Sequence, residues 1–346
     1  MDFIDSIDFI DELDVEFMEG IRDNNISRVR INPFEEYDDD QFKKKYRFSK
    51  AFAKKILDLV VDDLPSDTRG NTISPAIQVA CALRHWARHQ IQDDSGDMQG
   101  ISQQSISKIA RNVAEALAKK AHLFINMPTT LDEQQEAMRG FRSICNFPTV
   151  IGAIDCTHVK IRRVGGDMSE AYINRKGYYS INVQVVCDAK LKIRDIVARW
   201  RGSAHDSRIF NESLLKRRFE RGEFHGRLLG DSGYGCTSYL FTPVLNPSNS
   251  KEESYNRAHI RTRNTIERCF GLWKQRFWCL LRGMFMKLST AKTTIVALAV
   301  LHNIAIDMNE HLDIVRYVRH SSRSQTQRPT VRGAIIRQRF INQHFN

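Results

Sequence analysis

The sequence predicts an α/β fold preceded by an all-helical region, because its hydrophobic periodicity changes near residue 148. Before that point, apolar residues recur at the spacing of amphipathic helices. After it, three segments have the length and alternation of β-strands, and a helix, a fourth strand and a later helix follow them. Strands and helices in this order indicate a mixed sheet flanked by helices.

Composition and charge narrow the class of protein. A chain of 346 residues that is 42% apolar and 27% charged can bury a substantial core. Residues 1–40 hold 14 acidic residues and three arginines, a net charge of −11, so the other residues carry +22 to reach the total of +11. A basic body of this kind favours polyanions, nucleic acid first and acidic membrane surfaces second, although a merely soluble basic protein has the same composition.

The sequence contains little that indicates a transmembrane helix, a secretory signal or disulfide bonds. The longest mostly apolar stretch, residues 294–306, is interrupted by His302 and Asn303 and is too short to span a bilayer, so we predict no transmembrane helix. The N-terminus is acidic where a secretory signal would be basic and then apolar. Seven scattered cysteines without a C-x-x-C pair predict neither disulfides nor a zinc site. A reducing compartment is therefore expected.

Two predicted helices dominate residues 41–135. The first, "SPAIQVACALRHWARHQI", begins with Ser74 as N-cap and a proline at the first helical position. A break with Gly96 and Gly100 separates it from a second helix capped by Ser102. This order indicates a helix-turn-helix-like DNA-binding region, with an ordinary helical hairpin as the alternative. The outer side of the second helix would carry groups that can reach base edges and phosphates, namely Gln103, Gln104, Ser107, Lys108 and Arg111.

The α/β part begins with an antiparallel meander. Its strands are predicted at residues 150–161, 178–188 and 192–200, joined by short connections. The next segment, "GSAHDSRIFNESLLKRRFE", has a helical pattern. A short strand at residues 227–230 then leads into a glycine-lined turn, and a later helix has an apolar stripe that includes Ile266, Phe270, Trp273 and Phe277.

Three carboxylates occupy notable positions in these elements. Asp155 lies inside an apolar strand, Asp231 ends another strand, and Glu267 lies on the later helix. If folding brings them together they repel one another, and a divalent cation makes the arrangement favourable near neutral pH. Mg²⁺ and Mn²⁺ prefer oxygen ligands, and a pair of such ions supports phosphodiester cleavage. The residue types therefore indicate nuclease chemistry.

The helix around Glu267 carries two basic residues with it. Arg263, Glu267 and Lys274 stand at i, i+4 and i+11, so all three project from one helical face. The spacing predicts a metal ligand flanked by two phosphate anchors that bind DNA. The alternative is a solvated ion-pair stripe.

Six motifs in order, from about residue 70 to 310, resemble the PIF/Harbinger family of DDE transposases and their domesticated nuclease relatives. They are "GAIDCTHVKI", "RKGYYSINVQVVCD", "GSAHDSRIF", "LLGDSGYG", "NTIERCFGLWKQRF" and "AVLHNIA". The resemblance implies a ribonuclease H-like catalytic core at residues 136–310. It also implies that Asp155, Asp231 and Glu267 are the three catalytic acids and bind Mg²⁺ or Mn²⁺, and that Arg263, Glu267 and Lys274 match the Arg-x3-Glu-x6-Lys signature of related bacterial transposases.

Further positions near the predicted site have alternative roles. By resemblance Asp206 is an auxiliary metal ligand, although at a helix start it equally suits an N-cap. His158 should point to the face opposite Asp155 and pack, and His205 could bind a substrate phosphate. Arg175 and Lys176 precede a strand that enters the site, so they either hold the DNA backbone or form a plain surface loop. Cys156 stands beside the first acid where many relatives have glycine, and on a strand it should face away from Asp155.

We therefore expect a metal-dependent DNA endonuclease or transposase. By resemblance it acts on double-stranded DNA with a separate Myb/SANT-type partner protein and works in the nucleus, with cytoplasmic location in the absence of that partner. A homo-oligomer is also possible. Its rivals are a catalytically silent DNA-binding or adaptor protein with the same fold and, disfavoured by the ordered motifs, a structural α/β protein.

The two ends of the chain are expected to lie outside these domains. Residues 1–40 form an acidic N-terminal arm that serves as a partner-docking surface or masks the basic groove. Residues 311–346 form a basic, flexible tail, with seven arginines and no acidic residue after position 314. Such a tail can contact phosphates or act as an import signal.

Overall fold

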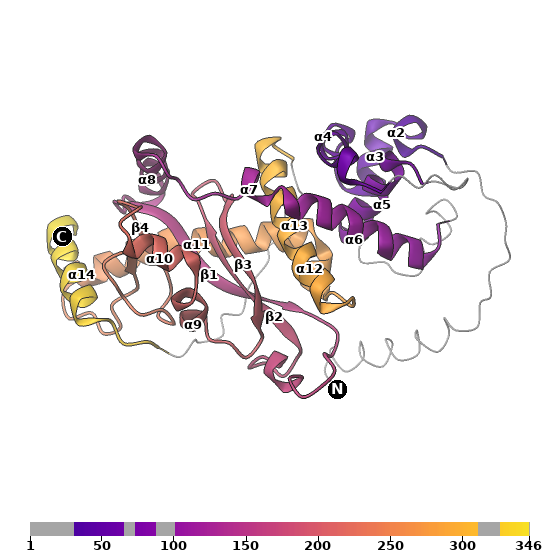
Figure 1. Ribbon diagram of the computed structural model, residues 1–346. Helices are drawn as coiled ribbons and strands as arrows, with labels where there is room; N and C mark the ends of the chain where they lie inside the picture. The colour runs from indigo at the N-terminus through magenta and orange to yellow at the C-terminus, as the bar shows by residue number, and fades with distance from the viewer. Residues whose placement is uncertain (1–30, 66–72, 88–100, 311–325, 346) are drawn as a thin grey trace, which may run out of the picture.

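The computed structural model describes residues 31–65, 73–87, 101–310 and 326–345, and its centre is a five-stranded mixed sheet (Figure 1). The strand order is β3-β2-β1-β4-β5, with β1, β2 and β3 antiparallel and with β4 and β5 parallel to β1. The strands are β1 Val150–Lys160, β2 Ser180–Cys187, β3 Ile193–Arg201, β4 Arg227–Leu229 and β5 Leu240–Phe241. The predicted meander and fourth strand are confirmed, and with them the ribonuclease H-like α/β fold class.

Helices precede the sheet and cover it. The N-terminal helices are α2 Pro33–Glu36, α3 Asp39–Tyr46, α4 Lys50–Val60, α5 Pro75–Ala87, α6 Gln103–Lys119 and α7 Ala121–Phe124. Those around the sheet are α8 Leu131–Cys145, α9 Asp206–Asn211, α10 Leu214–Glu220, α11 Ser250–Arg276, α12 Trp278–Arg282, α13 Leu288–Asp307 and α14 Val331–His344. Two 3₁₀ turns are Val61–Asp63 and Glu170–Tyr172.

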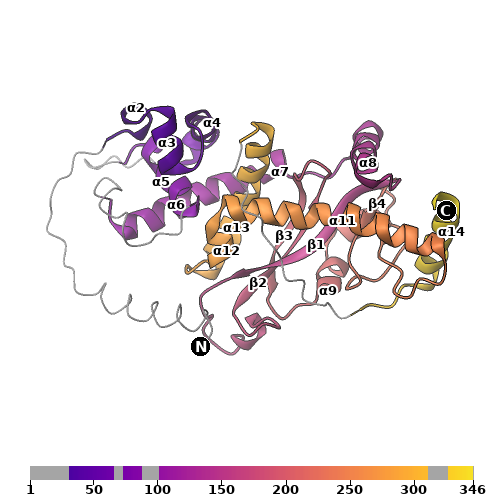
Figure 2. The ribbon, with the colours of Figure 1, turned by 180° about the vertical axis from the view of Figure 1, so that it is seen from behind.

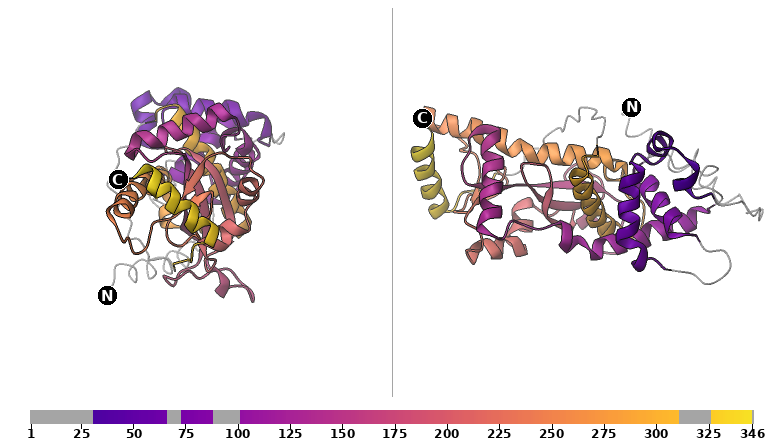
Figure 3. Two further views of the ribbon diagram at one scale, coloured as in Figure 1. Left: turned by 90° about the vertical axis from the view of Figure 1, so that its left-hand side faces the viewer. Right: turned by 90° about the horizontal axis from the view of Figure 1, so that it is seen from above.

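The two faces of the sheet have different covers. The long helix α11 crosses one face along β1 (Figure 2), while α9 contacts β2 from the other side. Helix α13 packs on β3 and also contacts α6, so it joins the sheet to the N-terminal helices. These N-terminal helices and α14 lie at opposite ends of an elongated molecule (Figure 3).

The N-terminal helices form where their caps and apolar faces predict them. Ser74 precedes α5 and Pro75 begins it, and the hydroxyl of Ser102 accepts the Ser105 N–H at the start of α6. The helical region is therefore confirmed. The predicted break between the two helices, with Gly96 and Gly100, lies outside the described residues. The predicted outer face of α6 is exposed, with Gln103, Gln104, Ser107, Lys108 and Arg111 on it.

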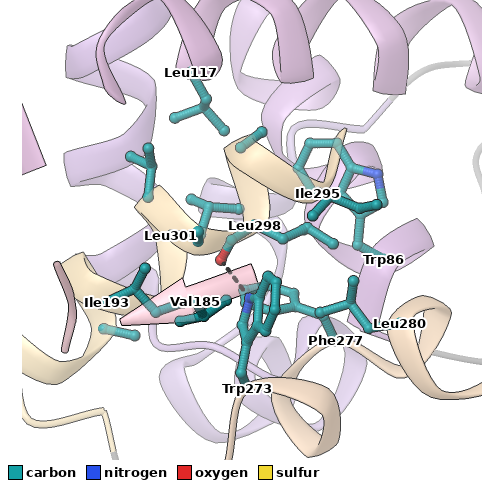
Figure 4. Packing of buried hydrophobic residues seen from close by; sticks show 14 of the residues in the cluster. Trp86, Leu117, Val185, Ile193, Trp273, Phe277, Leu280, Ile295, Leu298 and Leu301 are labelled. Atoms are coloured by element: carbon teal, nitrogen blue, oxygen red, sulfur yellow. Dashed lines mark hydrogen bonds between the residues drawn. The ribbon is translucent and has the colours of Figure 1, made fainter. Parts of the chain in front are cut away.

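One hydrophobic core runs from the N-terminal helices into the sheet. Around α13, side chains from α5, α6, β2, β3 and α11 meet in a single cluster (Figure 4). Within it, the Trp273 indole N–H donates to the Leu298 carbonyl oxygen at 3.1 Å, and both residues are fully buried. The predicted domain boundary between residues 135 and 136 falls inside α8, which packs on β1. Helix α8 thus belongs with the sheet rather than being divided between two domains.

Helix α13 contains the longest mostly apolar stretch of the sequence, residues 294–306. The apolar stretch within it is shorter than a bilayer is thick, but the whole helix has 20 residues and is long and apolar enough to cross a membrane. In this structure 67% of its most apolar part is buried inside the protein. It therefore serves as the central helix of the core.

Parts of the predicted acidic arm and of the predicted flexible tail are ordered elements. Pro33–Glu36 forms α2, and α3 begins at Asp39, so the last residues of the acidic arm belong to the helical region. In the basic tail, α14 buries Phe340 and Ile341. The prediction of a flexible tail is wrong for this segment because its apolar residues have a surface to cover. Residues 1–30 and 311–325 lie outside the described residues.

Buried histidines should make the stability of this core depend on pH. His302 on α13 is fully buried and its Nε2 lies 2.9 Å from the Leu191 carbonyl oxygen. Burial, assisted by Arg276, lowers the pKa of His302 to about 3. In the unfolded chain a histidine titrates near 6.5, so as pH falls below that value protons bind the unfolded state first and stability is lost until about pH 3.

We expect His302→Gln to reduce this loss. Between pH 7 and pH 5, one such histidine accounts for about 2 kcal/mol of the free energy of unfolding. Urea unfolding at both pH values should show a decrease about 2 kcal/mol smaller in the variant than in the unmodified protein. His225→Gln, which alters an exposed imidazole, is the control and should follow the unmodified protein. An equal decrease in all three proteins would contradict the assignment.

Candidate active site

Asp155 is a buried carboxylate in the middle of β1, and a guanidinium compensates its charge. The residue is 6% exposed. One of its carboxylate oxygens accepts the Cys156 N–H at 2.7 Å, and the other lies 3.3 Å from Nη1 of Arg263, 108 positions away along the chain. A buried carboxylate needs such partners, because an isolated charge in an apolar strand is strongly unfavourable.

Arg263 also binds Glu267, another of the three predicted acids. Its Nη2 donates to Oε1 of Glu267 at 2.7 Å, one turn further along α11. Burial by itself would lower the pKa of Arg263, but the carboxylates of Asp155 and Glu267 outweigh it and hold this pKa above its ordinary value. Asp155 and Glu267 therefore share one cation, and that cation is a side chain of the protein.

Asp231 lies in the turn after β4. Its Oδ1 accepts the Gly233 N–H at 2.9 Å, and its charge acts on both Arg263 and Asp206. The turn packs tightly, since a Cβ at Gly230 would lie 2.9 Å from the ring of Tyr234. The absence of a side chain at Gly230 thus lets β4 deliver Asp231 to the same region as Asp155 and Glu267.

Asp206 is the first residue of α9, and its N-cap is His205. The alternative of Asp206 as the N-cap is therefore wrong. Its Oδ1 instead accepts a hydrogen bond from the Asn182 amide at 3.0 Å, and the same amide nitrogen donates to the Ala204 carbonyl oxygen at 2.9 Å. Burial raises the pKa of Asp206, the bond from Asn182 opposes this, and Asp231 adds to it. Asn182 thereby orients the carboxylate.

Sequence reasoning missed three neighbours of these acids. They are Asn182, Tyr234 and, as a contact of the site, Cys156. The Cys156 thiol faces away from Asp155 as predicted, but it lies 3.4 Å from the Tyr234 hydroxyl, and burial raises the pKa of both groups well above their ordinary values. Asn182 was visible in the sequence as an amide inside an apolar strand, which is a signal that a buried polar group has a specific partner.

The arrangement is a site of converging acids rather than a preformed metal cage. Among the residues that the structure describes, no three histidine, cysteine, aspartate or glutamate side chains are close enough together to hold a metal ion. Asp155 and Glu267 instead bind the Arg263 guanidinium, and the charge of Asp231 also acts on it. Their oxygen donors suit Mg²⁺ or Mn²⁺ in kind, and binding such an ion requires Arg263 to release them.

The predicted phosphate anchors differ in their placement. Lys274 is only 8% exposed and its Nζ donates to the His158 carbonyl oxygen at 2.9 Å, so the structure contradicts a direct DNA contact by Lys274 in this conformation. The spacing correctly placed Arg263, Glu267 and Lys274 on one helical face, but that face packs on β1. The sequence could not show that β1 covers this face of α11, because helical periodicity places residues on a face but does not indicate what packs against it.

The basic residues before β2 lie at the edge of the site. Arg175 and Lys176 are exposed, and Nη2 of Arg175 lies 2.5 Å from Nδ1 of His205. The charge of Arg175 also acts on Asp206. His158, by contrast, bonds to the Ser180 hydroxyl at 3.0 Å and is partly buried, as expected of a packed residue. The predicted DNA-facing residues of α6 are on a different part of the molecule, beyond α13 (Figure 1).

The chain has the fold of the DDE endonuclease superfamily, and the family model described as DDE superfamily endonuclease matches residues 154–303. Mouse "Putative nuclease HARBI1" is 36% identical over 275 residues, which are 78% of each chain, and the human protein of the same name is 34% identical over the same shares. Arabidopsis thaliana "Protein ALP1-like" is 26% identical over 79% of this chain and 72% of its own. No solved structure matches this chain. The chain therefore belongs to the family of Harbinger transposase-derived nucleases.

Proposed function

We propose that this protein is a divalent-metal-dependent DNA endonuclease of the PIF/Harbinger type. Asp155, Asp231 and Glu267 are its catalytic and metal-binding residues, and Asp206 is an auxiliary ligand. The observation that carries the proposal is the shared guanidinium. Asp155 and Glu267 come from β1 and α11 and are close enough to bind one cation together.

The chemistry follows from the residue types. A bound Mg²⁺ or Mn²⁺ would activate the attacking water and stabilise the leaving oxygen of the phosphodiester. Asp155 is held rigidly by β1, Asp231 by its turn and Glu267 by α11, while Asn182 orients Asp206. If the protein is also a live transposase, the freed 3′ hydroxyl then attacks target DNA.

Arg263 acquires a second role in this scheme. In the absence of a divalent ion its guanidinium neutralises Asp155 and Glu267, which would otherwise repel each other. Once released, a guanidinium is well suited to bind a DNA phosphate. Arg175 and Lys176 support the DNA backbone at the edge of the site near His205. Gln103, Gln104, Lys108 and Arg111 offer a separate contact surface on α6.

The substrate and partners of this proposal are double-stranded DNA and a Myb/SANT-type partner protein, in the nucleus or, without that partner, in the cytoplasm. The net charge of +22 outside residues 1–40 supports a polyanionic substrate. A homo-oligomer is compatible with the proposal.

A second candidate is a catalytically silent DNA-binding or adaptor protein. One observation favours it, because Arg263 already compensates two of the acids without any metal. The chain is also similar to proteins that are not named as nucleases, such as Arabidopsis thaliana "Protein ALP1-like".

Cleavage of duplex DNA tests the two candidates against each other. We expect the purified protein, with its partner where that is known, to cut DNA with Mg²⁺ or Mn²⁺ and to stop when EDTA removes the ion. Asp231→Asn should be inactive. DNA binding without cleavage by either protein would favour the adaptor, and equal cleavage by both would refute the assigned acids.

A further inference from the structure

The C-terminal residues 326–344, here called the C-terminal strap, are bonded directly to the turn that carries Asp231. The Gln327 N–H donates to the Ser232 carbonyl oxygen at 2.9 Å. Three residues later, the N–H and the hydroxyl of Thr330 both donate to the Cys236 carbonyl oxygen, at 3.0 and 3.1 Å. The strap is thus bonded to the turn at both Ser232 and Cys236.

Packing holds the strap firmly in that position. A Cβ at Gly333 would lie 2.2 Å from the Cys236 carbonyl oxygen, so only glycine permits this close approach. Further along α14, the Phe340 ring packs edge-to-face on the Phe241 ring of β5, with the ring centroids 5.1 Å apart. Arg337 turns inward, where its Nη1 donates to the carbonyl oxygens of Thr242 and Pro243, both at 3.0 Å. These contacts hold the strap in a fixed position against the turn and β5.

All charged side chains on the outward side of the strap are basic. The strap contains four arginines and no aspartate or glutamate. Arg337 faces inward, while Arg328, Arg332 and Arg339 are exposed. Arg332 and Arg339 are seven residues apart on α14 and therefore lie on one helical face. Arg328 adjoins the turn itself, since its carbonyl oxygen is 3.5 Å from where a Cβ at Gly235 would be.

We propose that the strap binds the DNA backbone beside the scissile phosphate, with Arg328 and Arg332 as phosphate contacts and Arg339 extending the same track. The inference rests on the proposed function, because it takes the cleaved phosphate to lie near Asp231. Duplex DNA carries a phosphate about every 3.4 Å along each strand. The phosphates next to the cleaved one therefore lie over the residues that border Asp231, which include the strap. Rigidly mounted arginines there fix the register of the DNA without reading its sequence.

Nothing in the family match accounts for these residues, since the matched region ends at residue 303. The strap therefore adds a DNA-contacting element to the matched endonuclease region. Its arginines come from a part of the chain that the resemblance to DDE transposases does not assign.

The salt dependence of DNA binding tests the proposal. We compare the full-length protein with the double variant Arg328→Gln/Arg332→Gln, using fluorescence anisotropy of a labelled duplex in EDTA over a series of KCl concentrations. Losing two phosphate contacts should lower the slope of log K against log salt by about 1.8 and weaken binding on the order of 10- to 100-fold at 0.1 M salt. Both side chains are exposed, so circular dichroism and the melting temperature should not change.

A matched control separates local contacts from net charge. Arg139→Gln/Arg221→Gln removes the same charge from exposed positions on α8 and after α10, and should bind within about threefold of the unmodified protein. Equal affinity and slope in all three proteins would overturn the strap proposal and leave the proposed function standing. Equal weakening by both pairs would also overturn it, since net charge alone then acts. Failure of the unmodified protein to bind DNA would overturn both proposals.

Discussion

Asp155→Asn should reduce DNA cleavage on the order of a thousandfold, and Glu267→Gln should do the same. Both carboxylates bind one cation in the structure, so neither can hold a divalent ion in the proposed way without the other. For that reason the double variant should be no less active than either single variant, because residues that act as a unit have non-additive effects. Initial rates of nicking of a supercoiled plasmid with Mg²⁺ measure all three.

The free energy of unfolding should respond differently to the same substitutions, with the main loss in the double variant rather than in the single variants. Each single variant leaves Arg263 one carboxylate, so its cost should be small. The double variant leaves a mostly buried guanidinium without either of its bonded carboxylates and should lose up to about 3 kcal/mol of unfolding free energy. Glu253→Gln, on an exposed position of the same helix, is the control and should change neither the cleavage rate nor the free energy of unfolding.

The activity of the double variant decides whether the two acids share an ion. Additive losses of activity in that variant would show that they do not.

Trp273→Ala should destabilise the protein by about 3–5 kcal/mol, because it removes the largest kind of core side chain from a fully buried position. The indole also donates to the Leu298 carbonyl oxygen, which loses this partner. Since this cluster joins the N-terminal helices to the sheet, the loss should shift one common unfolding transition (Figure 4). Urea titrations followed by circular dichroism and by the fluorescence of the remaining tryptophans should coincide.

Trp278→Ala is the matched control for this prediction. Trp278 is partly exposed and contacts the guanidinium groups of Arg47 and Arg282 at 5.5 and 5.6 Å. Its loss should cost about 1 kcal/mol or less. Two separate transitions in the Trp273 variant, one for the helices and one for the sheet, would contradict a shared core.

The sequence correctly predicted those features of the fold that depend on residues close together in the chain. Alternating apolar residues predicted β1, β2 and β3, and capping residues predicted where α5 and α6 begin. The spacing of Arg263, Glu267 and Lys274 predicted one shared helical face. Such features depend on residues close together in the chain, so periodicity and capping suffice to predict them.

Other features depended on contacts that no local pattern contains. Lys274 resembled a solvent-facing anchor but is buried against the His158 carbonyl oxygen. The tail resembled a mobile basic segment, but two apolar residues of α14, Phe340 and Ile341, anchor it to the sheet end. In both cases the missing information was which distant surface covers the residue.

The sequence by itself determined the elements of this protein, its basic body and the identity of its acids. Only the tertiary structure decided that Arg263 compensates Asp155 and Glu267, that Asn182 orients Asp206, and that the C-terminal strap borders Asp231. The physical reason is that helix and strand formation follow from local spacing. The partner of a buried charge, in contrast, is selected by the packing of segments more than a hundred residues apart.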